Sequence, residues 1–170
     1  MRSTTLIRKI YRAFAGRRYP GHHDIVHCEY DRRWGGSLNG PCRECAEVVA
    51  AFRGKGNRGL RVEGLSDVSF GLVPLSEAAF PFWLPSYLAA GIRTTECGWN
   101  LFEGLQFRFR SPQDDKEAQW QVSRLALLSG AELEALIAAF EHMERQGKFS
   151  EDTAAAIVGN LSRWRRSLAP

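Results

Sequence analysis

The feature that most constrains the fold is a run of bulky apolar residues in the middle of the chain, interrupted by two prolines. It comprises Phe80, Pro81, Phe82, Trp83, Leu84, Pro85, Tyr87 and Leu88. Ser76, just upstream, is typical of a helix N-cap. Because proline removes a backbone donor and clashes with the preceding turn, we expect a kinked helix or two short helices. Because large aromatic side chains favour burial, we predict that the run forms the centre of the core. The alternative is that it lines an aromatic binding cleft.

Apolar residues spaced three and four apart predict further helices on both sides of this run. They cover residues 6–14, 41–53, 114–128 and 150–164. A capping box at Ser129 and Glu132 predicts another helix that ends near Gly147. At 170 residues the chain has the usual length of one domain, so we expect a single domain over residues 1–170.

A different period, of two residues, predicts a strand. Leu105, Phe107 and Phe109 alternate with polar residues, and Arg108 and Arg110 would form a basic surface on the outer face. Residues 24–30 alternate weakly and suggest a second short strand. The expected fold is therefore α+β and mostly helical, with about five helices around a small antiparallel sheet.

Charge is unevenly distributed along the chain. Nine of the 23 basic residues lie in residues 1–18 and 163–170, which hold no acid, whereas residues 19–162 carry 14 basic and 19 acidic residues, a net of −5. Packed together, the two ends would make a basic face for an acidic partner or nucleic acid. The alternative is that they pair with the acidic body, which argues against nucleic acid. The first helix, basic and amphipathic, would also suit a membrane surface.

Three of the four histidines and three of the four cysteines lie in residues 19–45. Cys42 and Cys45 form a Cys-x-x-Cys pair at a predicted helix start, with His27 and Cys28 upstream. Zinc takes four nitrogen or sulfur ligands, so these four residues are the candidate metal ligands and zinc the candidate cofactor. The spacing matches no standard zinc finger, and both cysteines of the pair lie on the apolar helix face, so burial in the core is the competing interpretation. A redox-active dithiol formed by Cys42 and Cys45 is a third interpretation.

The turn before this pair is the other candidate site. It contains Tyr19, His22, His23, Asp24 and His27. Residues of these types can transfer protons, and Cys28 nearby could act as a nucleophile. A hydrolase or transferase using Asp24, His27 and Cys28 would need a cleft around them. Whether the protein is an enzyme stays open, because no nucleophile-elbow motif accompanies these residues.

Three stretches together resemble a family of small bacterial proteins of unknown function. Residues 19–26 (Tyr-Pro-Gly-His-His-Asp-Ile-Val) resemble its Tyr-Pro-Gly-acid-acid-Asn-Ile-Val opening, and residues 44–55 resemble the helix that follows. Residues 75–88, with Phe-Trp-Leu-Pro-Ser-Tyr-Leu, resemble its Phe-x-x-Leu-Pro-x-Tyr-Leu core motif. The resemblance covers most of the chain but implies no activity. His22 and His23 replace acids of that pattern, which would remove an acidic function or create a metal site.

The expected function is that of a cytoplasmic protein-interaction module. A bacterial immunity or regulatory protein that masks a partner would fit a small, well-packed domain without a complete active site. The alternative is a zinc protein or enzyme that uses residues 22–45. We expect a protein partner and no membrane span, because no apolar run is long enough to cross a bilayer. The oligomeric state is left open.

Overall fold

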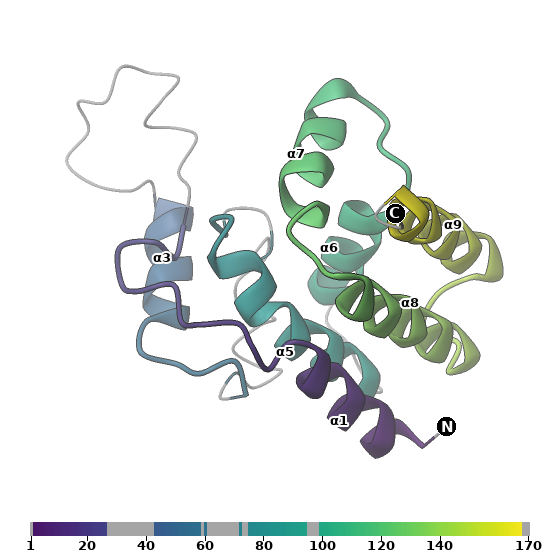
Figure 1. The fold of residues 1–170 in the computed structure, drawn as a ribbon, viewed down its shortest axis with the longest axis horizontal. Helices are drawn as coiled ribbons and strands as arrows, with labels where there is room; N and C mark the ends of the chain where they lie inside the picture. Colours follow the sequence, from purple (N-terminus) through teal and green to yellow (C-terminus); the bar gives the residue numbers. More distant parts are fainter. Residues whose placement is uncertain are drawn as a thin grey trace.

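The computed structural model describes residues 2–26, 43–58, 60, 72, 75–94 and 99–167 (Figure 1). In these ranges the regular elements are helices. They are α1 (Ser3–Ala13), α3 (Arg43–Phe52), α5 (Ala79–Arg93), α6 (Trp99–Phe109), α7 (Asp115–Leu125), α8 (Gly130–Arg145) and α9 (Glu151–Ser167). None of them is both long and apolar enough to cross a lipid bilayer.

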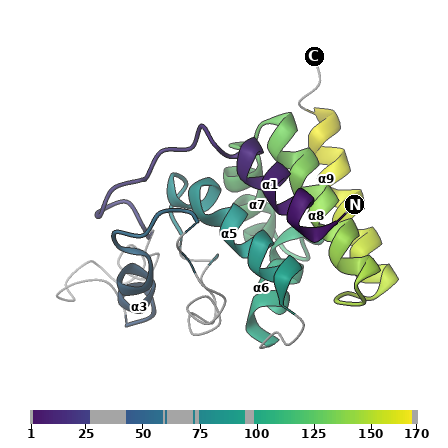
Figure 2. The same ribbon diagram turned by 90° about the horizontal axis from the view of Figure 1, so that it is seen from below.

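The helices pack around α5, which runs through the middle of the molecule. α1 lies against both α5 and α8, and α9 packs on α8 and α6 (Figures 1 and 2). Helix α3 lies on the far side of α5 from α8 (Figure 1). In the described residues α8 lies between α1 and α9 and contacts both, so the two basic helices pack on α8 and do not form one joint face.

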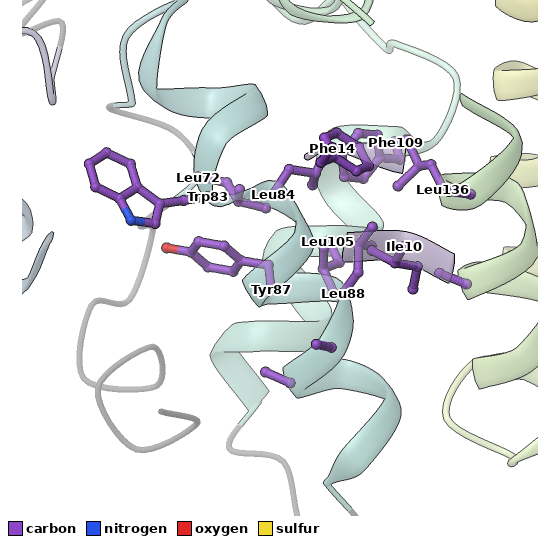
Figure 3. Packing of buried hydrophobic residues seen from close by; sticks show 14 of the residues in the cluster. Ile10, Phe14, Leu72, Trp83, Leu84, Tyr87, Leu88, Leu105, Phe109 and Leu136 are labelled. Carbon is purple, nitrogen blue, oxygen red and sulfur yellow. The ribbon is translucent and has the colours of Figure 1, made fainter. Parts of the chain in front are cut away.

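Helix α5 is the aromatic run of the sequence, and the prediction that it forms the centre of the core is confirmed. Every residue from 79 to 92 is buried. Figure 3 shows Trp83 and Tyr87 on one side of the helix, and Leu84 and Leu88 on the side toward Phe14, the residue that follows α1. A helix that is apolar all round is expected to be buried all round.

The prolines do not divide α5 into two helices. Pro81 lies in the first turn, where a backbone N–H has no partner within the helix in any case. Pro85 lies inside the helix and offers no N–H to the preceding turn. Neighbouring helices surround this turn, so burial of its side chains maintains a helix that local propensity alone would interrupt.

The prediction of an α+β fold is wrong, because the strand expected at residues 105–110 is helical. Leu101, Leu105 and Phe109 are all buried and lie four residues apart, so they form one stripe along α6. Leu101 extends this helical period to a position before residues 105–110, the segment in which apolar and polar residues alternate. A short alternating run fits a strand and one face of a helix equally well, and packing against α9 and α5 decides between them.

The second expected strand, at residues 24–30, is reduced to one pair of residues within the described ranges. Val26 forms an isolated antiparallel bridge with Leu75. Residues 27–30 lie outside the part of the chain that the structure describes. The described residues therefore contain no sheet, and they contain seven helices where about five were expected, so only the mostly helical part of the prediction stands.

Several local predictions are confirmed. Leu6, Ile7, Ile10 and Tyr11 form the buried face of α1. Ser129 and Glu132 form the expected capping box at the start of α8. Cys45 is 5% exposed and packs in the interior, as the core interpretation of that cysteine requires.

Candidate functional site

The Tyr19 side chain, proposed from the sequence as part of a functional turn, is a packing element. Its ring lies edge-on to those of Phe82 and Trp83, with both centroid separations 5.7 Å. The backbone N–H of Gly54 donates to the Tyr19 hydroxyl at 3.0 Å, and the hydroxyl is 3.1 Å from His22 Nδ1. The hydroxyl accepts from Gly54, and the tautomer of His22 decides which partner donates in the Tyr19–His22 contact. Tyr19 therefore connects the turn to the end of α3 and to α5.

The rest of the described turn is held by its backbone. The carbonyl of Asp24 accepts from the Ser76 hydroxyl, and the carbonyl of Ile25 accepts from the Ser76 N–H at 3.1 Å. The side chains of His22, His23 and Asp24 are exposed. The structure thus brings Tyr19 and His22 together, whereas the Asp24 side chain is exposed and its described hydrogen bond is made by its backbone carbonyl.

The candidate metal site falls mainly outside the described residues. His27, Cys28 and Cys42 lie there, so the structure does not test their arrangement with the buried Cys45. Within the described ranges, no three histidine, cysteine or acidic side chains lie close enough to hold a metal ion. Zinc binding stays a prediction from the sequence.

The basic surface proposed at Arg108 and Arg110 has a different environment from the one expected. Arg110 forms an ion pair with Glu117 at 3.2 Å, and both side chains are largely buried. The Arg108 guanidinium lies 5.0 Å from the centre of the Trp120 ring, a cation–π contact. These two arginines join α6 to α7.

A cluster that the sequence did not predict lies along the outer face of α1. Here a cleft of about 600 Å³ is lined by α1, by the turn after α3 and by the last residue of α5. Its charged lining consists of Arg8, Arg12, Arg58 and Arg93. We call this feature the arginine cleft. Ser3, Thr4 and Tyr11 contribute the hydroxyl groups of the lining.

The arginine cleft carries positive charge without a matching negative charge. All four arginines are exposed, and the described lining contains no acidic side chain. None of the four forms an ion pair with a described residue, whereas Arg17, Arg43, Arg110, Arg124 and Arg165 each have a glutamate partner. The Arg58 guanidinium lies 5.1 Å from the centre of the Tyr11 ring, which orients it over α1.

Local sequence explains how each arginine reaches the cleft. Arg8 and Arg12 are four residues apart, so they lie one above the other on α1. Arg93 ends α5, where a cation would ordinarily satisfy the last carbonyl groups. That role belongs to Lys148, whose Nζ donates to the carbonyls of Gly91 at 2.6 Å and Ile92 at 2.8 Å. The Arg93 guanidinium is therefore available to the cleft.

Ser3 and His142 form the one nucleophile–base pair that borders the described part of the cleft. Ser3 Oγ lies 2.9 Å from His142 Nε2, and the Gln146 side chain donates to Ser3 Oγ at 3.4 Å. Burial, with a further contribution from the charge of Arg145, lowers the pKa of His142 below its ordinary value. A general base must hold the proton that it takes, and this environment disfavours the imidazolium form. The pair anchors the start of α1 to α8.

Sequence reasoning identified only part of this cluster. It noted the basic, acid-free residues 1–18, which include Arg8 and Arg12, but it gave neither Arg58 nor Arg93 a functional role. The available signal was the lack of acid in residues 1–18. The convergence of three segments on one cleft is a tertiary property that periodicity along the chain cannot reveal.

Comparison with protein-family models, curated proteins and solved structures found no match. The family resemblance of the sequence therefore stays a prediction, and the function must be argued from the arginine cleft itself.

Proposed function

We propose that the protein is a cytoplasmic protein-interaction module that holds an acidic partner protein in the arginine cleft. A bacterial immunity or regulatory protein that masks its partner is the particular role that fits. The observation that carries the proposal is the cleft: four exposed arginines with no acidic side chain in the described lining. Recognition of acidic motifs by arginine clusters is a recurring mode of protein binding.

The charge arrangement supports a binding role because it is unfavourable for the free protein. Like charges four residues apart on a helix, as at Arg8 and Arg12, destabilise the helix. An acidic partner would convert this repulsion into attraction and would be steered toward the cleft. Binding through such a surface should be fast and sensitive to salt.

A catalytic role has weaker support in the described residues. The Ser3–His142 pair has the distance of a catalytic dyad. Burial of His142, and then the charges of Arg145, the chain N-terminus and Lys148, lower its pKa and oppose the protonation that a general base must undergo. The pair is better explained as an anchor between α1 and α8.

The test uses the full chain co-expressed with the product of each neighbouring gene. A complex that survives size-exclusion chromatography should be lost when both Arg8→Glu and Arg12→Glu are introduced. It should persist with Lys9→Glu, which makes the same kind of charge change at an exposed position of α1 outside the cleft lining. A complex that tolerates the double reversal as well as the control contradicts the proposal, as does the lack of any complex.

A further inference from the structure

The charge of the arginine cleft narrows the chemistry of the group that enters it. Four guanidinium groups face a shared cleft whose described lining supplies no negative charge. A carboxylate brings one negative charge. A phosphate monoester brings about 1.5 to 2 charges at neutral pH and three strong acceptor oxygens, so one phosphoryl group balances far more of this cluster.

The directions from which the arginines come also favour a phosphoryl group. Arg8 and Arg12 belong to α1, whereas Arg58 and Arg93 come from the turn after α3 and from the end of α5. A planar carboxylate accepts forked donors mainly in its own plane. The oxygens of a phosphoryl group are arranged tetrahedrally and accept from several sides, and guanidinium forks match them well.

The volume and the lining of the cleft indicate which kind of molecule carries the phosphoryl group. A volume of about 600 Å³ exceeds what a bare phosphate fills and lies in the range of small-molecule and side-chain pockets. Tyr11 is 9% exposed, and the Arg58 guanidinium lies over its ring, so the aromatic group of the lining offers no open face for stacking a nucleobase. Recognition of nucleotides and single-stranded RNA relies on such stacking. A phosphorylated side chain of a protein fits better.

We infer that the arginine cleft is a receptor for a phosphate monoester dianion carried on a side chain of the partner protein. The inference rests on the proposed function, since it names the group that the partner presents. Arg8 and Arg12 bind the phosphoryl oxygens from α1, and Arg58 and Arg93 close the cleft around them.

The experiment measures binding of four probes to the full chain by calorimetry: inorganic phosphate, capped phosphoserine, capped glutamate and adenosine monophosphate. Capped phosphoserine and phosphate should bind and compete, and capped glutamate should bind at least about 10-fold more weakly. Arg8→Gln with Arg12→Gln should weaken phosphoserine binding by about 10- to 100-fold. Lys9→Gln, the matched control, should not change it. Arg8→Lys with Arg12→Lys keeps the charge but loses the forked donors, and should give an intermediate loss.

The outcomes separate this inference from the proposed function. Equal binding of capped glutamate and phosphoserine, both lost in the Arg8 and Arg12 variant, overturns the phosphate inference and keeps the acidic partner. Tighter binding of adenosine monophosphate than of phosphoserine overturns the protein source of the phosphate. Phosphoserine binding that the double variant leaves unchanged overturns the assignment to the cleft. If no probe binds while a co-expressed partner still depends on Arg8 and Arg12, the phosphate inference alone fails.

Discussion

Two neighbouring regions, residues 17–26 and the arginine cleft, use their polar groups in opposite ways. In residues 17–26, Arg17 donates two hydrogen bonds of 2.6 Å to Glu132. The Tyr19 hydroxyl accepts from the Gly54 N–H, and the carbonyls of Asp24 and Ile25 accept from Ser76. In the cleft, four arginines have no acidic partner among the described residues. Groups satisfied within the chain contribute to its stability, whereas groups left unsatisfied at a concave surface are suited to a ligand.

This contrast separates the two candidate sites by physical role. The turn at residues 19–24 contains residue types that can do chemistry, yet its described polar contacts connect it to Gly54, just after α3, and to Ser76, just before α5. The cleft consists of residue types that are common on any surface, and its location makes it distinctive. The contrast predicts that substitutions in residues 17–26 reduce stability, and that substitutions in the cleft reduce binding instead.

The largest effect on stability is expected for Arg17→Ala. Glu132 is buried, with 4% of its side chain exposed, and loses its cationic partner in this variant. An unpaired buried carboxylate is strongly destabilising, so we expect the free energy of unfolding to fall by about 3 kcal/mol. Urea denaturation of the two proteins measures the difference.

A double-mutant cycle with Glu132→Ala separates the ion pair from other losses. Glu132 also accepts from the Ser129 N–H in the capping box, so Glu132→Ala alone removes two interactions. In the double variant, the loss should be smaller than the sum of the single losses by more than about 1 kcal/mol. Additive losses would show that Arg17 and Glu132 act independently and would weaken the contrast.

A smaller loss is expected for Tyr19→Phe. This change keeps the ring against Phe82 and Trp83 but removes the acceptor of the Gly54 N–H. Gly54 is exposed, so water replaces the bond in part and the cost should be about 0.5–1 kcal/mol. His22→Ala should cost less still. If His22→Ala instead abolished partner binding while leaving stability unchanged, the turn would be a binding site and the contrast would fail.

The sequence predicted the helices of the core better than the site, for a physical reason. The buried faces of α1, α5 and α8 follow from local periodicity and capping residues, which act within one element. The prediction of a strand at residues 105–110 was wrong because alternation over six residues is also compatible with a helix. Contacts with other helices bury Leu101, Leu105 and Phe109, which lie along one face of α6. The arginine cleft brings together arginines up to 85 positions apart, from Arg8 to Arg93, and no local pattern encodes that proximity.

His142, which contacts Ser3 of the arginine cleft, predicts a dependence of stability on pH. Burial, and then Arg145, lowers its pKa below the ordinary value of 6.5, so the unfolded chain binds the proton more readily than the folded one. The contribution of His142 is therefore complete above pH 6.5 and is lost as the pH falls through its folded pKa. Unfolding free energies measured between about pH 7 and pH 5 should fall more steeply for the wild type than for His142→Gln. Parallel curves for the two proteins would contradict the prediction.

The smallest expected change has the opposite sign and is the most direct test of the contrast. Arg8→Gln with Arg12→Gln removes a like-charge pair, so the free energy of unfolding should stay the same or rise by up to about 0.5 kcal/mol at low salt. Lys9→Gln, on the same helix, controls for the loss of a charge. A loss above about 1 kcal/mol would mean that these two arginines stabilise the fold as Arg17 does. Unchanged stability combined with lost binding separates the two roles, because a group held only for a ligand contributes nothing to the folded chain alone.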